Sequence, residues 1–241
     1  MDEKILKVNE NIKLIQPLKG HTFGTDAFLL YAFMNSSKNA LELGTGTGII
    51  SLLCCNSNKF LHIDALEVQS EMTDIASKNV TINNLNDKIN IINSDLRYFN
   101  GKYDVVFSNP PYIKIDSGVH NPDISKNISR REIFGTIDDF CNCASRCLNY
   151  GGSFYVVWRP ERLCDLIFSM RNHKIEPKRL VLVYPTPKSK SCLVLVEGKF
   201  GGKCGSLFVA PPLILNDLNG ETEDYHYIYE RGEFPELFKK P

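Results

Sequence analysis

The fold of this chain is decided by the stretch Asn39-Ala40-Leu41-Glu42-Leu43-Gly44-Thr45-Gly46-Thr47-Gly48-Ile49-Ile50. Its apolar beginning predicts a short strand, its glycines predict a turn, and Ile49 opens an apolar helix. Glycine permits positive φ and lets a ligand approach the backbone closely. The third glycine of a G-x-G-x-x-G fingerprint is missing, because that position is Ile49. The stretch therefore favours a nucleotide-binding βα turn without being a dinucleotide motif, and by itself it is a weak signal.

Acidic residues follow the next two predicted strands. Strand 61–66 ends at Glu67, about 20 residues after the glycine turn, where a carboxylate is placed to accept hydrogen bonds from two ribose hydroxyls. The alternative for Glu67 is an ordinary surface residue. Strand 89–93 leads to Asp95, whose carboxylate suits the exocyclic NH2 of an adenine. Together with the glycine turn, these acids predict a site along the carboxyl edge of a parallel sheet.

The fourth strand runs directly into a rigid polar turn in Asp104-Val105-Val106-Phe107-Ser108-Asn109-Pro110-Pro111-Tyr112. The two prolines cannot continue a ladder and hold Asn109 extended at the strand end. The amide oxygen of Asn109 and the carbonyl of Pro110 are acceptors, and Tyr112 offers a flat aromatic face. This set suits a planar group that carries an NH2. The same residues also fit an ordinary Pro-Pro turn, and the stretch alone does not decide between the two.

The order of elements predicts the fold class. Three successive βα units with polar strand ends indicate an α/β doubly wound sheet. Strands 179–184 and 191–197 follow each other without a helix between them, so we expect them to form an antiparallel hairpin at the end of the sheet. We expect a β/helix extension over residues 1–35, the main domain over 36–215 and a loosely packed polar tail over 216–241.

Composition limits the classes of function. The 241 residues suffice for one large α/β domain, and 28 basic and 28 acidic residues give a net charge of +0. A nucleic-acid partner must therefore meet a local basic patch rather than a basic protein. No apolar run approaches the roughly 18 residues of a membrane span, and residues 1–4 show no signal-peptide pattern. We expect a cytoplasmic protein.

The eight cysteines include no C-x-x-C pair. Free buried thiols in a reducing cytosol are the favoured interpretation. A metal site at Cys141, Cys143 and Cys147 is the alternative, although residues two apart on a helix point in different directions. We expect no metal.

These motifs together resemble class I S-adenosylmethionine-dependent methyltransferases, and the Asn-Pro-Pro-Tyr motif is typical of those that methylate planar amino or amide nitrogens. Nearly the whole chain resembles the bacterial tRNA1(Val) adenine-37 N6-methyltransferase family, with further support from segments 23–30, 158–163, 176–180 and 201–212. The resemblance implies a Rossmann-like seven-stranded sheet, S-adenosylmethionine as methyl donor and tRNA as partner. It implies cofactor contacts at Asp26, Glu42, Gly44, Gly46, Gly48, Glu67, Asp95, Leu96 and Asn109. It assigns the target amino group to Asn109 and Pro110, and stacking on the target base to Tyr112.

A tRNA partner needs a basic rim around the carboxyl edge. Ten residues in loops and at strand ends are candidates for it: Lys114, Lys126, Arg130, Arg131, Lys178, Arg179, Lys188, Lys190, Lys199 and Lys203. The alternative is an ordinary solvated surface.

Three other functions compete with this interpretation. A protein glutamine N5-methyltransferase acting on release factors shares the Asn-Pro-Pro-Tyr site, but such enzymes usually carry a larger helical domain before the glycine turn, and only about 40 residues precede it here. A guanine N2 or cytosine N4 methyltransferase is the second, and a cofactor-dependent RNA-binding or assembly protein without turnover is the third. The sequence does not reveal the oligomeric state.

Overall fold

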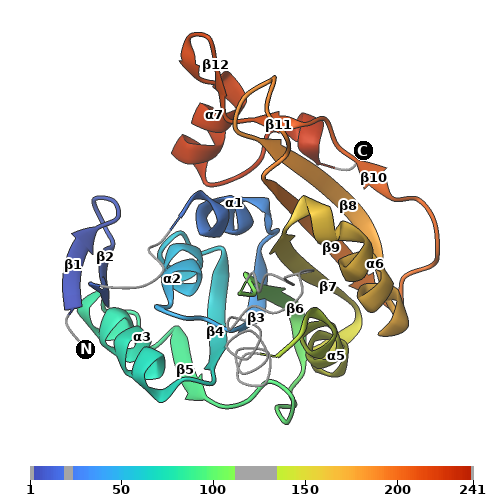
Figure 1. Cartoon of the computed structure of the whole chain (residues 1–241). Coiled ribbons are helices and arrows are strands. Elements are labelled where there is room, and N and C mark those ends of the chain that lie inside the picture. The colour runs from blue at the N-terminus through green and yellow to red at the C-terminus, as the bar shows by residue number, and fades with distance from the viewer. Residues whose placement is uncertain (1–2, 19–23, 112–134, 240–241) are drawn as a thin grey trace, which may run out of the picture.

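The computed structural model describes residues 3–18, 24–111 and 135–239, and one twisted sheet runs through the middle of the molecule (Figure 1). Seven long strands follow the order β5-β4-β3-β6-β7-β9-β8, and two short strands, β10 and β11, lie beside β8. The strands are β3 (Ser37–Leu43), β4 (Phe60–Glu67), β5 (Ile89–Asn93), β6 (Tyr103–Ser108), β7 (Leu148–Trp158), β8 (Ile175–Tyr184), β9 (Leu193–Phe200), β10 (Phe208–Val209) and β11 (Leu213–Ile214).

Strand direction confirms the predicted sheet. Strands β3 to β7 are parallel, whereas β9 runs antiparallel to both β7 and β8. The β8–β9 pair is the expected terminal hairpin, which forms because its strands are joined by a short loop that cannot make a parallel crossover. The architecture is a Rossmann-like α/β sheet.

Helices cover both faces of the sheet. Helices α2 and α3 follow β3 and β4 on one face together with α1, whereas α5 and α6 pack on the other (Figure 1). Their bounds are α1 (Thr25–Phe33), α2 (Ile49–Asn56), α3 (Ser70–Ile82), α5 (Ile137–Cys147) and α6 (Leu163–Asn172), with the 3-10 turn η1 (Pro160–Arg162) before α6. The chain leaves β3 toward β4 in one direction and returns to β6 on the other side of β3. The switch point of this doubly wound sheet therefore lies between β3 and β6, where such sheets bind their ligands.

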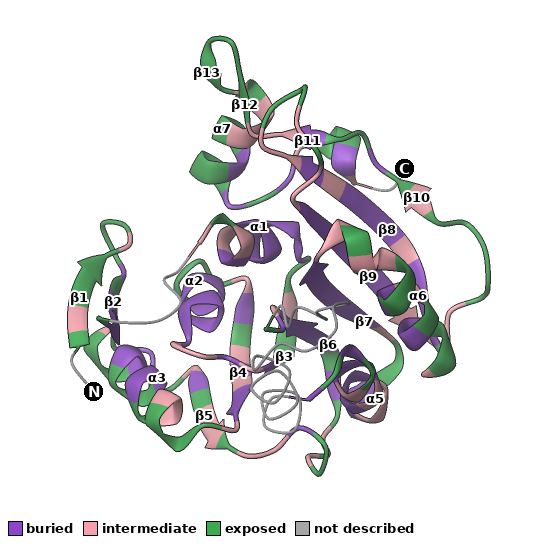
Figure 2. Cartoon of the chain, in the orientation of Figure 1, coloured by how far each residue is buried: buried purple, intermediate pink, exposed green. Residues whose placement is uncertain are grey.

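The core explains why these strands lie at the centre. The apolar side chains of β3 and β6 are buried on both faces, as Figure 2 shows for the middle of the sheet. Phe107 of β6 stacks on Phe60 of β4 with ring centroids 5.8 Å apart. Strands covered on both faces read as continuous apolar runs, which is what the sequence shows at residues 105–107.

The N-terminal part is a hairpin followed by a helix. Strands β1 (Glu3–Lys7) and β2 (Lys13–Pro17) pair with each other alone, and β2 packs against α3. Helix α1 begins at Thr25 with Gly24 as its N-cap and without a side-chain cap. Thr25 and Asp26 are of residue types favoured at a helix N-cap, but neither side chain caps α1. The Asp26 carboxylate makes other contacts, described below.

The segment 216–241, expected to be a loosely packed polar tail, forms regular structure as far as the structure describes it. After the small hairpin of β12 (Asn216–Asp217) and β13 (Gly220–Glu221) comes helix α7 (Glu223–Arg231), and the 3-10 turn η2 (Glu236–Phe238) follows it. Ile228, Phe234 and Phe238 are fully buried in the same core cluster as α1 and α2. Burying each of these side chains stabilises the fold by roughly 1.5–3 kcal/mol. Four well-spaced apolar residues thus hold a polar segment in place, counting Tyr225, which packs against the cluster.

Candidate active site at the switch point

The register of the parallel strands sets the site. Leu43 of β3 pairs with Leu66 of β4 on one side and with Ser108 of β6 on the other. The residues that follow these three positions therefore emerge at one level of the carboxyl edge. They are Gly44, Glu67 and Asn109, which the sequence had singled out separately. The Ser108 hydroxyl donates to the Leu43 carbonyl at 2.7 Å and adds a cross-strand tie directly below the site.

The glycine turn requires glycine at three positions. Gly44, Gly46 and Gly48 have φ of 74°, 57° and 82°, in the left-handed region that side chains disfavour. The turn is anchored by Gly44 N and Thr45 N, which donate to the Leu66 carbonyl at 3.0 and 2.8 Å. A Cβ on Gly46 would meet no atom within 4 Å. The turn thus leaves open space over its backbone, as a closely bound ligand needs.

Glu67 is tied to this turn by its own carboxylate. Its Oε2 accepts from Gly46 N at 2.9 Å, and its Oε1 accepts from Gln69 N at 3.0 Å, while the side chain is only 5% exposed. A carboxylate accepts about four hydrogen bonds, so acceptor capacity remains for hydroxyl donors beside the turn. These acceptor oxygens fit the two hydroxyl donors of a ribose. Ribose binding by Glu67 is a prediction from the sequence, which the geometry supports.

Glu42 braces the turn from below. Its buried Oε2 accepts from the Thr45 hydroxyl at 2.7 Å and from the Ser51 hydroxyl. Burial raises the pKa of Glu42 to about 7, against the lowering effect of the two hydroxyl donors. These contacts give Glu42 a role in shaping the turn. Direct contact with the cofactor stays a prediction.

Asp95 and Leu96 follow β5 at the far end of the same edge. The Asp95 carboxylate is held by the Arg97 guanidinium, with Nε 2.9 Å from Oδ2 and Nη2 2.5 Å from it. Hydrogen bonding to Arg97 lowers the pKa of Asp95 below its usual value, so this carboxylate is ionised. Leu96 is buried, and its carbonyl accepts from Arg146 at 2.8 Å. Contact of Asp95 and Leu96 with an adenine stays a prediction. In such a complex the Asp95 carboxylate would accept from both Arg97 and the adenine.

Asn109 is oriented by a residue from the N-terminal part of the chain. Its Nδ2 donates to Asp26 Oδ2 at 3.0 Å, while Asp26 Oδ1 accepts from Ala27 N at 2.9 Å. An amide whose nitrogen faces a carboxylate has its oxygen on the opposite side. Pro110, next in the chain, is buried, and Pro111 is exposed. The structure thus places Asp26 beside the Asn-Pro-Pro turn, whereas the resemblance implied a contact with the cofactor.

The remaining predicted residues are undescribed, lie at the expected edge or lie elsewhere. Tyr112, Lys114, Lys126, Arg130 and Arg131 lie outside the described residues. Lys188 and Lys190 are exposed in the loop after the carboxyl end of β8, which points the same way as β6 and β7.

Four of the basic residues predicted to lie around the carboxyl edge of the sheet do not lie there: Lys178, Arg179, Lys199 and Lys203. Lys178, Lys199 and Lys203 lie at the opposite edge, because β9 runs backward and β8 begins there; the Lys178 ammonium donates to the Lys203 carbonyl at that edge. Arg179 is 3% exposed, pairs with Glu197 at 3.0 Å and donates to the Phe33 carbonyl at 2.7 Å.

Sequence reasoning missed Asn79, which fixes the outer side of the turn. Its buried Nδ2 donates to the carbonyls of Thr47 and Ile15 at 2.9 and 2.8 Å, and its Oδ1 accepts from Ile15 N at 2.6 Å. One amide therefore joins the glycine turn, α3 and β2. The signal was present, since Asn79 stands on the apolar face of α3 between Ala76 and Val80.

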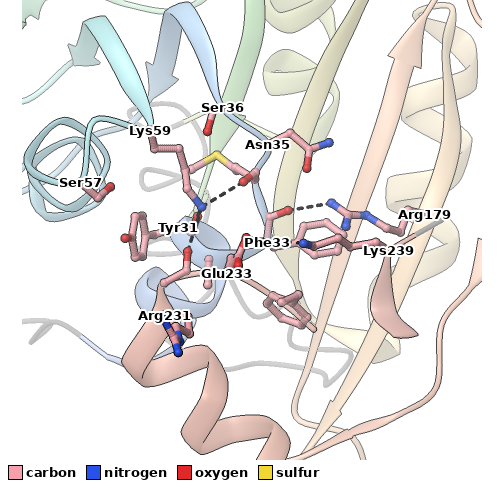
Figure 3. A pocket seen from close by; sticks show the side chains of 14 residues that line it. Tyr31, Phe33, Asn35, Ser36, Ser57, Lys59, Arg179, Arg231, Glu233 and Lys239 are labelled. Atoms are coloured by element: carbon pink, nitrogen blue, oxygen red, sulfur yellow. Dashed lines mark hydrogen bonds and ion pairs between the residues drawn. The ribbon is translucent and has the colours of Figure 1, made fainter. Parts of the chain in front are cut away.

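A separate cavity of about 320 Å³ lies at the opposite edge, where the C-terminal segment meets α1 (Figure 3). A basic side chain that lines the cavity, Lys59, stabilises the fold through hydrogen bonds to the backbone. The half-buried Lys59 donates through its ammonium group to the carbonyls of Tyr31, Met34 and Gly232 at 2.8, 3.0 and 3.0 Å, and desolvation lowers the pKa of Lys59 to about 8. Three carbonyl acceptors use all the donors of one ammonium group. This cavity is a structural junction at a distance from Gly44 and Asn109.

The described ranges contain no helix long and apolar enough to cross a membrane, and no group of three His, Cys, Asp or Glu side chains that could hold a metal. All eight cysteines are free thiols. Five are buried as expected, whereas Cys164 and Cys204 are exposed and Cys192 is half-buried.

Comparison with known proteins identifies the family of the chain. The family model described as the methyltransferase small domain matches residues 22–171. Relatives named tRNA1(Val) (adenine(37)-N6)-methyltransferase include one from Phocaeicola vulgatus, 28% identical over 86% of each chain, and one from Histophilus somni, 31% identical over 69% of this chain and 78% of the relative.

Solved structures share the fold. A predicted O-methyltransferase from Agrobacterium tumefaciens superposes with a TM-score of 0.70 at 17% identity, over 88% of this chain and 98% of the other. A methyltransferase from Pyrococcus furiosus gives a TM-score of 0.61 at 19% identity, over 81% and 92%. With the glycine turn, Glu67 and Asn109 at one switch point, the chain belongs to the methyltransferase small domain family and is an S-adenosylmethionine-dependent methyltransferase.

Proposed function

We propose that this enzyme methylates the N6 amino group of an adenine in tRNA, at position 37 in the anticodon loop of tRNA1(Val). The observation that carries the proposal is the Asn109 amide at the end of β6, whose nitrogen donates to Asp26 at 3.0 Å. In the proposal, the amide oxygen faces the substrate. The relatives named for this reaction share most of the length of the chain and support the choice of substrate.

The chemistry of the acceptor set favours an amino group. An exocyclic adenine amine is a weak nucleophile, because its lone pair is delocalised into the ring. Accepting its two N–H groups at Asn109 Oδ1 and the Pro110 carbonyl directs that lone pair along one line and stabilises the positive charge that grows on nitrogen. Bound S-adenosylmethionine supplies the methyl group on a sulfonium. The proton released after transfer is acidic and leaves to water, so no strong base is needed beforehand.

The position of the acceptors suits a base that has left its stack. Asn109 and Pro110 lie in the turn that ends β6, beside the switch point of the sheet. We expect Tyr112 to stack on the target base. An unpaired base of an anticodon loop reaches such a pocket at lower energetic cost than a base in a duplex.

Basic residues on the same edge support an RNA partner. Lys188 and Lys190 project from the loop after β8, on the edge that carries Asn109. With a net charge of +0, the protein must bind phosphates through such local positive charge.

Transfer of labelled methyl from S-adenosylmethionine to total tRNA lacking the modification tests the proposal. We expect N6-methyladenosine in the nucleoside digest, and loss of activity by at least about 1,000-fold in Asn109→Ala, since the variant loses both the acceptor and its alignment. Asn100→Ala, which changes an exposed asparagine with only a local hydrogen bond, is the matched control. A tRNA1(Val) transcript with guanine at position 37 should accept no methyl.

The same assay includes the competing substrates. Transfer to a release factor but not to tRNA would replace the proposal with glutamine N5-methylation. A product of N2-methylguanine or N4-methylcytosine would retain the amino-group site and reject the adenine.

A further inference from the structure

Gln16 is a buried amide without a partner. It is 1% exposed, and neither its Oε1 nor its Nε2 has a hydrogen-bond partner among the described residues. Buried side-chain amides are almost always hydrogen-bonded, and an unpaired one destabilises the fold. A leucine of similar volume would fill the same space without that loss. The residue therefore calls for an explanation other than packing.

Its position places it beside the glycine turn. Gln16 follows Ile15, whose backbone N and O are both bound by the Asn79 side chain, and the same Asn79 nitrogen binds the Thr47 carbonyl of the turn. Alternation along β2 puts Gln16 on the same face as Leu14, which is fully buried in the core cluster with α1 and α2. The amide is therefore buried on the inner side of β2, next to the residue that Asn79 joins to the glycine turn.

The order of groups along the edge identifies what arrives there. Glu67, suited to a ribose, stands at the end of β4, and Asn109, where the methyl is received, stands at the end of β6. The glycine turn of β3 lies between them. A donor with its ribose at Glu67 and its sulfonium methyl directed to Asn109 must place its third sulfur substituent, the aminobutyrate chain, over the turn. The positive end of the α2 dipole favours a carboxylate in that place.

We propose that Gln16 binds the amino-acid end of S-adenosylmethionine. A primary amide matches this zwitterion, because its oxygen accepts from the α-ammonium group and its NH2 donates to the α-carboxylate. The inference rests on cofactor use, on Glu67 facing the ribose and on methyl transfer at Asn109, and it is independent of which nucleic acid or protein is methylated. Asn79 holds the β2 backbone and the turn at a fixed separation, so that the amide of Gln16 is positioned before the ligand binds.

Two ligands that differ only at this end provide the test. S-adenosylhomocysteine carries the aminobutyrate group, whereas 5′-methylthioadenosine lacks it, and the affinity of each is measured by calorimetry without any methyl acceptor. In Gln16→Leu we expect the Kd of S-adenosylhomocysteine to rise at least tenfold and that of methylthioadenosine to change less than twofold. The variant without ligand should melt at the same temperature as the wild type or higher, because an unpaired amide has been removed.

A matched variant separates the two ends of the ligand. Gln69→Leu changes the only other glutamine of the chain, which donates to Glu67 at 3.4 Å on the ribose side. It should change the affinity for both ligands by the same factor. If Gln16→Leu weakens both ligands alike, or weakens neither, the proposal is overturned. If that variant does not fold, Gln16→Met gives the same comparison with a flexible side chain of similar length.

Discussion

The Asn109 side-chain nitrogen lies 3.0 Å from Asp26 Oδ2, so two residues 83 positions apart in the sequence form one unit at the switch point. The amide of an asparagine is nearly symmetric in shape, and its two orientations differ only in which atom faces the substrate. A carboxylate accepts but does not donate, so Asp26 selects the orientation that turns the oxygen toward an incoming amine. Asp26 thus acts as a positioning residue for Asn109.

Asp26→Asn tests this role. The new amide can donate as well as accept, so it no longer selects one orientation of Asn109. We expect kcat to fall about 10- to 100-fold, the loss of one charge-assisted hydrogen bond, with little change in the KM for S-adenosylmethionine. Steady-state kinetics at varied cofactor concentration separate the two parameters. Asp224→Asn, in the first turn of α7, is the control. A large rise in KM at unchanged kcat would instead assign Asp26 to cofactor binding.

Glu67→Gln should weaken cofactor binding. The carboxylate accepts from Gly46 N and Gln69 N, and a glutamine presents a donor to one of these N–H groups. We expect the Kd of S-adenosylhomocysteine to rise about 10- to 100-fold, through the displaced turn and the lost ribose acceptor together. Calorimetry measures the change. Glu71→Gln, in the first turn of α3, serves as the control, and equal affinities in all three proteins would contradict the role of Glu67.

Glu42 should make stability depend on pH. Burial raises its pKa from the ordinary 4.5 to about 7 in the folded protein, so the folded state holds a proton that the unfolded chain has released between those values. The free energy of unfolding should therefore fall as pH rises from about 4.5 to about 7 and then level off. The size is roughly 3 kcal/mol, at 1.36 kcal/mol for each pKa unit.

Urea denaturation of wild type and Glu42→Gln across pH 4.5–8 isolates this contribution. The glutamine keeps a side chain of the same shape but does not titrate, so the difference between the two curves reports Glu42 alone. Parallel curves would show that the carboxyl is not perturbed by its burial.

Lys188 and Lys190 should bind RNA phosphates. In the double variant Lys188→Gln/Lys190→Gln we expect the KM for tRNA to rise several-fold and the slope of log KM against log salt to decrease by about 1–2, because up to two phosphate contacts are lost. Lys203→Gln, which removes an exposed charge at the opposite edge, should change neither quantity. An equal effect of the two changes would place the RNA elsewhere.

Lys59 should hold the C-terminal segment to the core. Its ammonium joins the end of α1 to Gly232 at the end of α7. Lys59→Met leaves three buried carbonyls without a donor, and we expect a loss of about 2–4 kcal/mol in the free energy of unfolding. Lys38→Met, at an exposed position, should change it by less than about 0.5 kcal/mol. Chemical denaturation at neutral pH compares them.

Much of the fold was contained in local patterns. Apolar runs that end in glycine, acidic residues or prolines determined the parallel strands, because each strand must be buried and each strand end must satisfy its own backbone. The short loop between β8 and β9 determined the reversed hairpin, since a parallel crossover needs a longer connection. Gly44, Glu67 and Asn109 were found for the same reason: they occupy the first positions after buried strands.

Only the tertiary structure decided which residues meet across the chain. Asp26 reads locally as a helix cap, yet its carboxylate faces Asn109, and the partner of a side chain 83 residues away leaves no local signal. Lys203 is a basic residue in a loop after a strand, as an RNA contact would be, but the reversed direction of β9 places it at the other edge of the sheet. The segment 216–239 is polar on average, although the buried side chains of Ile228, Phe234 and Phe238, with Tyr225 beside them, anchor it to the core. The sequence determines which functional groups stand at the end of each strand. Strand register and chain reversal decide which of these groups lie together in one site.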